Sequence, residues 1–390
     1  MIKLIKSTFY NEKRVKAELT EFIRSAKQLS FGPECEKFER DFAAYQGRKY
    51  CVFLNSGSSA NLALIQSLLN LGRLSRNDAV GFSALTWATN VMPLIQLGLK
   101  PIPIDIELET LNVSSKNLLN ILKRYPLKAI FITNLLGFCH DLDQIKKICR
   151  SKNIILLEDN CEGLGTIYKK TKLGNFGLAS TFSFFVGHHM STIEGGAVLT
   201  DDRELAQMLK MVRAHGWDRH LQYQEREKLK SIHGIKDFHA RYTFYDLAYN
   251  MRPSEINGFL GNCQLGYLDE IVMKRNANFI KLAGAIYNKE RFYPIKYDHI
   301  DFVSNFAFPI LCRSQRDYNE LIRKLERKIE IRPIVGGNML LQPFFKKHIT
   351  RRGRSFTCPN ADLLHHQGFY FGNNPELTYK ELEGIIHLIR

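Results

Sequence analysis

Strand and helix patterns alternate along the first 210 residues, and this alternation constrains the fold more than any other feature of the sequence. Short apolar runs rich in β-branched and aromatic residues are the expected strands, at 49–56, 79–83, 100–106, 128–134, 153–159, 177–185 and 196–200. Segments with helical spacing of apolar residues lie between or after them, at 58–72, 86–98, 115–124, 141–151 and 202–216. Such alternation is typical of a mostly parallel sheet flanked by helices. The sequence therefore predicts an α/β fold.

The remainder of the chain predicts a second, smaller domain of α+β type. Residues 218–245 are polar and charged, and we expect them to form a loop or an excursion from the main sheet. A long helical pattern over 254–290 then leads into short strands and helices that run to the end of the chain. We therefore expect a large domain over 1–260 and a smaller C-terminal domain over 261–390.

Composition and charge argue against several function classes. The chain shows no secretory signal pattern and no apolar run near the roughly 20 residues that a membrane span needs. Its eight cysteines form no Cys-x-x-Cys pair, and we expect reduced thiols in a cytoplasmic enzyme. The net charge of +16 indicates either a solubilising basic surface or a preference for anionic ligands such as nucleotides. Nucleic acid is not an expected partner, because the basic residues are spread along the chain.

Three segments that follow predicted strands carry candidate ligand-binding residues. Gly57 and Ser58 open a helix whose free amides suit an anion, although an ordinary serine N-cap has the same pattern. Trp87 is either core packing or a flat surface for a planar ligand. Glu158 and Asp159 end a strand, where a carboxylate can pair with a ring nitrogen, bind a metal or cap a helix. A metal is the less favoured reading, since no His or Cys cluster with ligand spacing lies nearby.

Two adjacent histidines stand in the stretch TFSFFVGHHMSTIEGG (181–196). With the three segments above, this order resembles the DegT/DnrJ type of nucleotide-sugar aminotransferases, a family with the pyridoxal-phosphate fold type I. The family pattern around the cofactor lysine reads Ser-Phe-x-x-x-Lys, with Glu-Gly-Gly beginning six residues after the lysine. Ser183 and Glu194 both place His188 at that position, and no lysine lies between Lys172 and Lys210. An imidazole cannot link the cofactor covalently, so simple aminotransferase activity is not expected.

The histidine has a parallel in one branch of the family, the pyridoxamine-dependent 3-dehydratases of 3,6-dideoxysugar pathways, to which EDNCE (158–162) and HHMSTIEGG (188–196) are similar. The resemblance implies a lyase that removes the C3 hydroxyl of a nucleotide-linked 4-keto-6-deoxyhexose. It implies pyridoxal 5′-phosphate and pyridoxamine 5′-phosphate as cofactors, regenerated by L-glutamate. The pathway implied is deoxysugar synthesis for the lipopolysaccharide O-antigen.

Cysteine placement separates two kinds of enzyme within this branch. Those acting on CDP-4-keto-6-deoxyglucose carry an iron–sulfur cluster, whose cysteines lie in the C-terminal half and include a Cys-x-Cys pair. Here Cys263, Cys312 and Cys358 stand alone in that half, fewer than the four thiolates that a [2Fe–2S] cluster usually needs. The chain therefore is more similar to the cluster-free enzymes that act on GDP-4-keto-6-deoxymannose in colitose synthesis.

The resemblance also implies roles for individual residues. His188 is expected to move protons as a general base and acid, and Asp159 to keep the cofactor's ring nitrogen protonated. Ser183 is expected at the cofactor phosphate, and Asn250 is expected to reach that phosphate across the interface of a homodimer with a shared active site. Glu162 either packs by the ring or hydrogen-bonds His188.

Gly57, Ser58 and Trp87 complete the expected cofactor site. His189 is out of register by one residue and receives a supporting or structural role. Three alternatives are kept: an aminotransferase with a non-covalent cofactor, a dehydratase of CDP-4-keto-6-deoxyglucose, and a cofactor-binding regulator without turnover.

Overall fold

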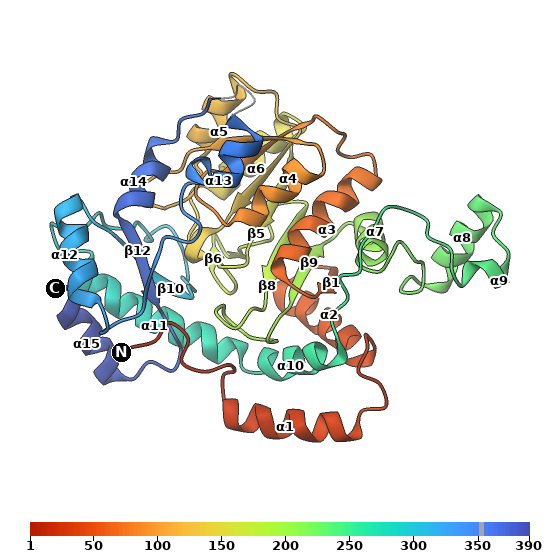
Figure 1. The fold of residues 1–390 in the computed structure, drawn as a ribbon, viewed down its shortest axis with the longest axis horizontal. Coiled ribbons are helices and arrows are strands. Elements are labelled where there is room, and N and C mark those ends of the chain that lie inside the picture. The colour runs from red at the N-terminus through yellow and green to blue at the C-terminus, as the bar shows by residue number, and fades with distance from the viewer. Residues whose placement is uncertain (351–354) are drawn as a thin grey trace.

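A seven-stranded sheet forms the centre of the molecule, as the computed structural model, which describes residues 1–350 and 355–390, shows (Figure 1). All seven predicted strands are present: β1 (Tyr50–Leu54), β2 (Ala79–Ser83), β3 (Lys100–Ile104), β4 (Ala129–Thr133), β5 (Ile155–Asp159), β8 (Ala179–Ser183) and β9 (Gly196–Thr200). Their order is β1-β9-β8-β5-β4-β2-β3, and β9 alone runs against its neighbours. The predicted α/β fold with a mostly parallel sheet is confirmed.

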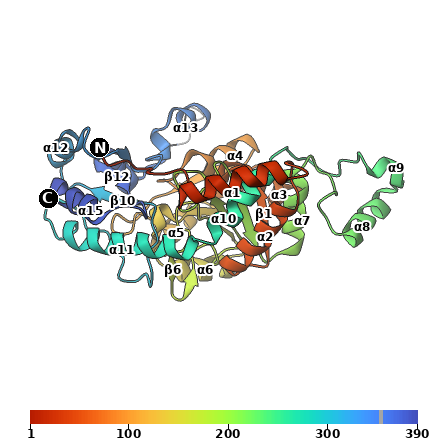
Figure 2. The same ribbon diagram turned by 90° about the horizontal axis from the view of Figure 1, so that it is seen from below.

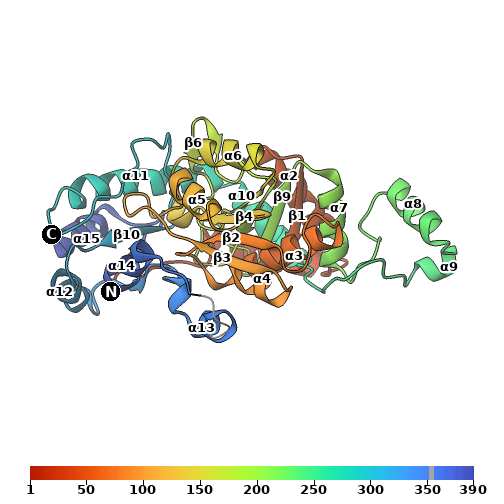
Figure 3. The same cartoon turned by 90° about the horizontal axis from the view of Figure 1, so that it is seen from above.

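Helices cover both faces of this sheet. Seen from above, α5 (Ser115–Leu122) and α6 (Leu142–Ser151) lie on one side, and α3 (Gly57–Asn70) and α4 (Met92–Gln96) lie on the other (Figure 3). Further helices are α1 (Glu12–Ser25), α2 (Pro33–Gln46) and α7 (Arg203–Arg213). A parallel sheet buried on both faces explains why its strands read as continuous apolar runs.

Two helix predictions need correction. The helix expected over 86–98 is only a 3-10 turn, η1 (Ala88–Asn90), followed by the short α4. Pro93 stands in the first turn of α4, where a residue without an N–H is tolerated, and it prevents one continuous helix. The helix expected over 254–290 is divided into α10 (Glu255–Leu265) and α11 (Leu268–Ile286).

A three-stranded antiparallel sheet forms the smaller part of the fold, with the order β10 (Ala307–Leu311), β12 (Gly368–Gly372), β11 (Ile331–Pro333). The helices of this part are α12 (Gln315–Leu325), α13 (Pro343–His348), α14 (Pro359–Gln367) and α15 (Tyr379–Ile389). The chain's first residues lie with this sheet, because Ile2 pairs with Ile329 and the Leu4 amide bonds to Glu330. The predicted division between residues 260 and 261 falls inside α10 and stays a prediction.

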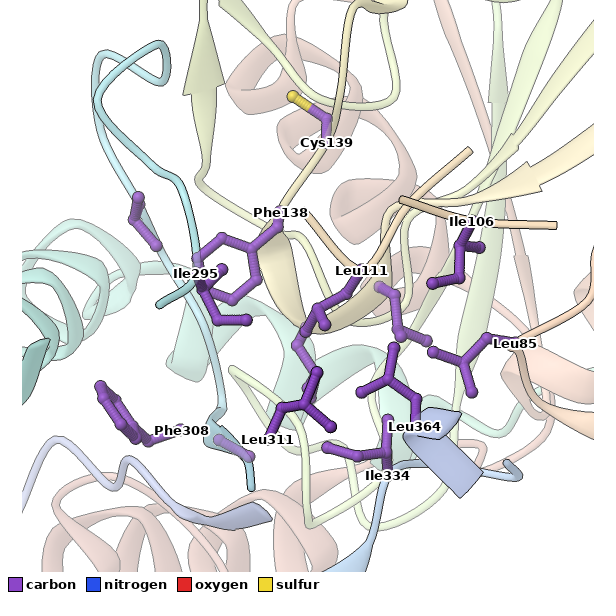
Figure 4. Packing of buried hydrophobic residues seen from close by; sticks show 14 of the residues in the cluster. Leu85, Ile106, Leu111, Phe138, Cys139, Ile295, Phe308, Leu311, Ile334 and Leu364 are labelled. Atoms are coloured by element: carbon purple, nitrogen blue, oxygen red, sulfur yellow. The ribbon is translucent and has the colours of Figure 1, made fainter. Parts of the chain in front are cut away.

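One apolar cluster joins the two parts (Figure 4). Leu111 and Phe138 come from the loops around the large sheet, whereas Phe308, Leu311 and Leu364 come from the smaller part. All five side chains are buried. Burial of apolar surface stabilises by about 25 cal/mol per Å², so this shared core fixes the small sheet against the carboxyl ends of the large one.

The polar segment 218–245 contains two helices, α8 (Tyr223–His233) and α9 (Asp237–Ala240), which project from the body (Figures 1 and 2). Neither helix has a buried residue, which explains why no apolar periodicity marks them in the sequence. Within the described residues, no helix has both the length and the apolar character needed to cross a membrane.

Candidate active site

A cavity of about 500 Å³ opens at the carboxyl ends of β1, β4, β5 and β8. Its floor comes from these strand ends and the start of α3, and its roof from the smaller sheet and the N-terminal residues. The lining residues are Leu4, Ile5, Ser56, Gly57, Ser58, Asn61, Trp87, Thr89, Thr133, Asp159, Cys161, Glu162, Ser183, Phe185, Gly187, His188, Glu194, Phe306, Glu330, Arg332, Val335 and Tyr370. Seven of the eight predicted site residues are among them.

Asn250 is the predicted site residue that does not line this cavity. It is exposed, and its Oδ1 accepts a hydrogen bond from Arg252 Nε at 3.1 Å. Its expected reach across a dimer interface stays a prediction.

The start of α3 forms a tight cradle at the cavity floor. Ser56 caps the helix, and its Oγ accepts a hydrogen bond from the Ser59 amide at 3.0 Å. The following amides of Gly57 and Ser58 have no partner within the helix, as at every helix start. Gly57 packs directly on β8, because a Cβ there would lie 2.7 Å from Ser183 Cβ. Free amides, a serine hydroxyl and the helix dipole together suit an anion such as phosphate.

Asp159 lies at the end of β5 with three hydrogen-bond donors around it. Its Oδ2 accepts from Asn61 at 3.1 Å and from Asn90 at 2.8 Å, and its Oδ1 accepts from the Cys161 amide at 2.9 Å. The side chain is buried, and within the described part of the chain no basic residue forms an ion pair with it. Because a buried charge is costly without a counter-charge, the site favours a cationic group of a ligand next to Asp159.

The neighbouring Glu158 has a different environment. It is fully buried, and its carboxylate accepts hydrogen bonds from the amides of Gly174, Phe176 and Gly177. Glu158 is therefore a structural residue, and only the second carboxylate of the pair faces the cavity.

The two adjacent histidines occupy different environments. His188 lines the cavity, and its ring packs edge-on against Phe306 with the ring centroids 5.3 Å apart. Burial lowers the pKa of His188 to about 4, so the ring is neutral at pH 7. His189 points away from the cavity, where its Nε2 lies 3.2 Å from the Ser304 carbonyl oxygen.

Arg275 holds the histidine loop from below. Its Nη2 donates to the His188 carbonyl at 3.1 Å, and the guanidinium also donates to the carbonyls of Phe306 and Asn373. These bonds connect the backbone of the loop at His188 to the residues that flank strands β10 and β12 of the smaller sheet.

Glu162 and Trp87 complete the cavity wall. Glu162 Oε2 accepts from the Leu136 amide at 2.8 Å, and the hydrogen bonds of the described residues include none between Glu162 and His188. Burial raises the pKa of Glu162 to about 8, and the charge of Asp159 adds to this shift, so the carboxyl is protonated at neutral pH. Trp87 is 53% exposed and faces the cavity, which rules out the core-packing reading of this residue.

The family is shown by comparison with known proteins. The sequence profile of the DegT/DnrJ/EryC1/StrS aminotransferase family matches residues 10–390. The chain belongs to this family. The family and fold class predicted from the sequence are confirmed.

Individual members of the family are similar over the whole chain. The GDP-4-keto-6-deoxy-D-mannose 3-dehydratase of Yersinia pseudotuberculosis is 34% identical over 397 residues, which cover 98% of this chain and 97% of that protein. A solved GDP-4-keto-6-deoxymannose-3-dehydratase with a trapped PLP-glutamate geminal diamine is 31% identical, has a TM-score of 0.88 and covers both chains completely. A histidine-to-asparagine variant of this enzyme with bound GDP-perosamine is 30% identical, with a TM-score of 0.88 and the same complete coverage.

Sequence reasoning missed several residues that line the cavity or hold a lining residue in place. Asn61 and Asn90 bond Asp159 but lie 98 and 69 residues from it in the chain. Arg332 and Tyr370 reach the cavity from the smaller sheet. No local pattern marks such residues, because each becomes part of the site only through tertiary contacts.

Proposed function

We propose that this chain is a 3-dehydratase that depends on pyridoxal 5′-phosphate and pyridoxamine 5′-phosphate. Its proposed substrate is a nucleotide-linked 4-keto-6-deoxyhexose, GDP-4-keto-6-deoxymannose first, from which it removes the C3 hydroxyl. One observation carries this proposal: His188 lines the cavity at the place of the family's cofactor lysine, and the described lining contains no lysine. The relatives named as GDP-4-keto-6-deoxymannose 3-dehydratases support the same activity and cofactor.

The cavity fits a pyridoxal phosphate in three respects. The start of α3 with Ser183 offers an anion cradle, and it is so closely packed that Gly57 has no room for a Cβ. Asp159 is a buried carboxylate next to the cavity without a protein counter-charge, as a protonated ring nitrogen requires. Trp87 exposes a flat indole to the same space. Gly57, Ser58, Ser183, Asp159, Glu162 and Trp87 are thus the residues that would hold the cofactor.

The bound cofactor supplies an amine for the sugar ketone and a ring that withdraws electrons from the reacting carbons. The chain's own residues then have separate tasks. Asp159 would hold the proton on the ring nitrogen, because its side chain lies at the cavity and its oxygens are oriented by three hydrogen-bond donors. His188, neutral at pH 7, would accept the carbon-bound proton that is released as electrons enter the ring, and would return that proton to the C3 hydroxyl, which leaves as water.

A histidine serves this reaction better than a lysine. A lysine amine would compete for the cofactor aldehyde through a covalent bond, whereas an imidazole transfers protons and cannot form that bond. Glu162 supports the site as a protonated carboxyl that is anchored on the Leu136 amide.

The partners are part of the proposal. L-Glutamate is the amino donor that restores the pyridoxamine form, as the glutamate adduct of the related structure supports. We place the enzyme in the cytoplasm as a homodimer, with Asn250 contributing to the partner's site. The proposed pathway is the synthesis of deoxysugars for the lipopolysaccharide O-antigen.

The product mass tests this function. The protein is incubated with pyridoxal phosphate, L-glutamate and a panel of GDP- and CDP-linked 4-keto-6-deoxyhexoses. A 4-keto product that has lost the C3 oxygen is expected with the GDP-mannose derivative, and turnover beyond one equivalent requires glutamate. A product that keeps all its hydroxyls and gains an amino group identifies an aminotransferase instead. A requirement for added iron and a reductase, with the CDP sugar preferred, would move the assignment to the cluster-containing branch.

A further inference from the structure

Arg332 brings a positive charge into the active-site cavity from the smaller sheet. In the antiparallel pair of β11 and β12, Arg332 stands opposite Tyr370. Residues opposite each other in such a pair have their side chains on the same face. Both residues line the cavity, so this face of the sheet forms part of its roof.

The described lining residues include no other group that is positively charged at neutral pH. His188 is the only other basic residue there, and burial lowers its pKa to about 4. The acidic residues of the lining are Asp159, Glu162, Glu194 and Glu330. The two proposed substrates are both anions, since glutamate carries two carboxylates and the sugar carries a diphosphate. A cation in the lining would therefore favour the binding of either substrate, since the other charged side chains of the cavity are acidic.

The guanidinium of Arg332 is held in place but keeps donors free. Its Nη2 bonds to Glu330, and Glu330 is fixed in turn by the Leu4 amide at 3.0 Å. A second, long bond of 3.3 Å joins Nη1 to the Ile331 carbonyl. A guanidinium has five N–H donors in a rigid fork, so several remain for a ligand. The side chain is 52% exposed and therefore accessible from the cavity.

We propose that Arg332 is the anion anchor of the active site and binds the carboxylate of glutamate or the diphosphate of the nucleotide sugar. This inference rests on the proposed function, because that function defines the two anionic substrates. A guanidinium fork matches carboxylate and phosphate oxygens equally well, which suits a site that takes both substrates in turn. Arg332 is a binding residue and takes no part in proton transfer.

Three variants test the anchor. Arg332→Gln removes the charge, Arg332→Lys keeps the charge but loses the fork, and Arg316→Gln is the matched control on the exposed face of α12, outside the cavity. For each variant, KM and kcat are measured separately for glutamate and for GDP-4-keto-6-deoxymannose. The affinities for GDP and for pyridoxal phosphate and the melting temperature are measured by titration and thermal unfolding.

In Arg332→Gln we expect KM to rise about 10- to 100-fold for at least one substrate, with little change in kcat, because a charge-assisted hydrogen bond is lost. If KM rises for glutamate alone, Arg332 binds the glutamate carboxylate. If KM rises for the nucleotide sugar and GDP also binds more weakly, Arg332 binds the diphosphate. Arg332→Lys should recover part of the loss. Pyridoxal phosphate affinity and melting temperature should stay at wild-type values, since Arg332 is half exposed and lies in the roof.

The anchor is refuted if KM for both substrates and the GDP affinity are unchanged in Arg332→Gln, or if Arg316→Gln shows the same loss. Failure of the proposed function is distinguishable from failure of the anchor. If the protein does not dehydrate the sugar, the reaction of bound pyridoxal phosphate with glutamate, followed by absorbance, and the titration with GDP still report on Arg332.

Discussion

Replacing Gly57 by alanine should weaken both the fold and cofactor binding. The added Cβ would lie 2.7 Å from Ser183 Cβ, 3.1 Å from Ser183 Oγ and 3.2 Å from Cys161 Sγ. The first of these is roughly 1 Å below the optimal carbon–carbon separation of about 3.5–4.0 Å. Ser183 belongs to β8 in the interior of the sheet, so it has little freedom to move. Overpacking of this kind costs about 1–3 kcal/mol.

Helix propensity opposes this cost, because alanine is better than glycine in a helix by up to about 1 kcal/mol. The net expectation is a loss of about 1–2 kcal/mol in the free energy of unfolding. Displacement of the α3 start also removes amides from the phosphate cradle, and each 1.4 kcal/mol lost there weakens binding about tenfold. We expect the Kd for pyridoxal phosphate to rise by about that factor.

Urea unfolding and a fluorescence titration with pyridoxal phosphate measure the two effects. Gly284→Ala is the matched control, because Gly284 is exposed in α11 and no atom lies within 4 Å of its added Cβ. The control should be stabilised by about 0.4–1 kcal/mol and bind the cofactor as the wild type does. If Gly57→Ala is as stable as the control and keeps the wild-type Kd, the close contact between α3 and β8 is wrong.

Three further outcomes follow from the site. Borohydride treatment of the pyridoxal form should attach no cofactor mass to the chain, and a reduced adduct on any lysine near the cavity would contradict this. Asp159→Asn should slow both the glutamate half-reaction and the dehydration, because both need the protonated ring; wild-type rates would mean that Asp159 only holds the turn after β5. As pH falls from 6.5 toward 4, the unfolded chain binds a proton at His188 that the native chain does not, so this residue lowers the free energy of unfolding. Urea unfolding at pH 7 and 5 should show a smaller loss in His188→Asn than in the wild type, and equal losses would refute the buried, neutral imidazole.

The sequence predicted the large sheet well because each strand is buried on both faces and is therefore a short apolar run. The sequence also pointed to Asp159 and Ser183, which line the cavity, because each ends such a run and strand ends of one sheet meet at one edge. The spacing from two reference positions, Ser183 and Glu194, predicted that His188 rather than His189 occupies the lysine position, and His188 is the histidine that lines the cavity.

Other parts of the structure had no local signal. The polar helices α8 and α9 bury no residue, so they carry no apolar periodicity. Trp87 and Pro93 interrupt a stretch whose apolar spacing alone predicts a helix. The hydrogen bonds of Asp159 and the position of Arg332 in the cavity lining depend on contacts between residues far apart in the chain. Periodicity and spacing in the sequence do not report such contacts.

The rate of sugar dehydration in two single variants tests the central claim, that His188 moves the proton, most directly. Both are measured at saturating cofactor. His188→Asn should lose about 10²–10⁴-fold, the usual contribution of a general acid–base group, while it still binds the cofactor. His189→Asn should lose much less, because its ring points away from the cavity toward the Ser304 carbonyl. An inactive His189→Asn beside an active His188→Asn would contradict the account.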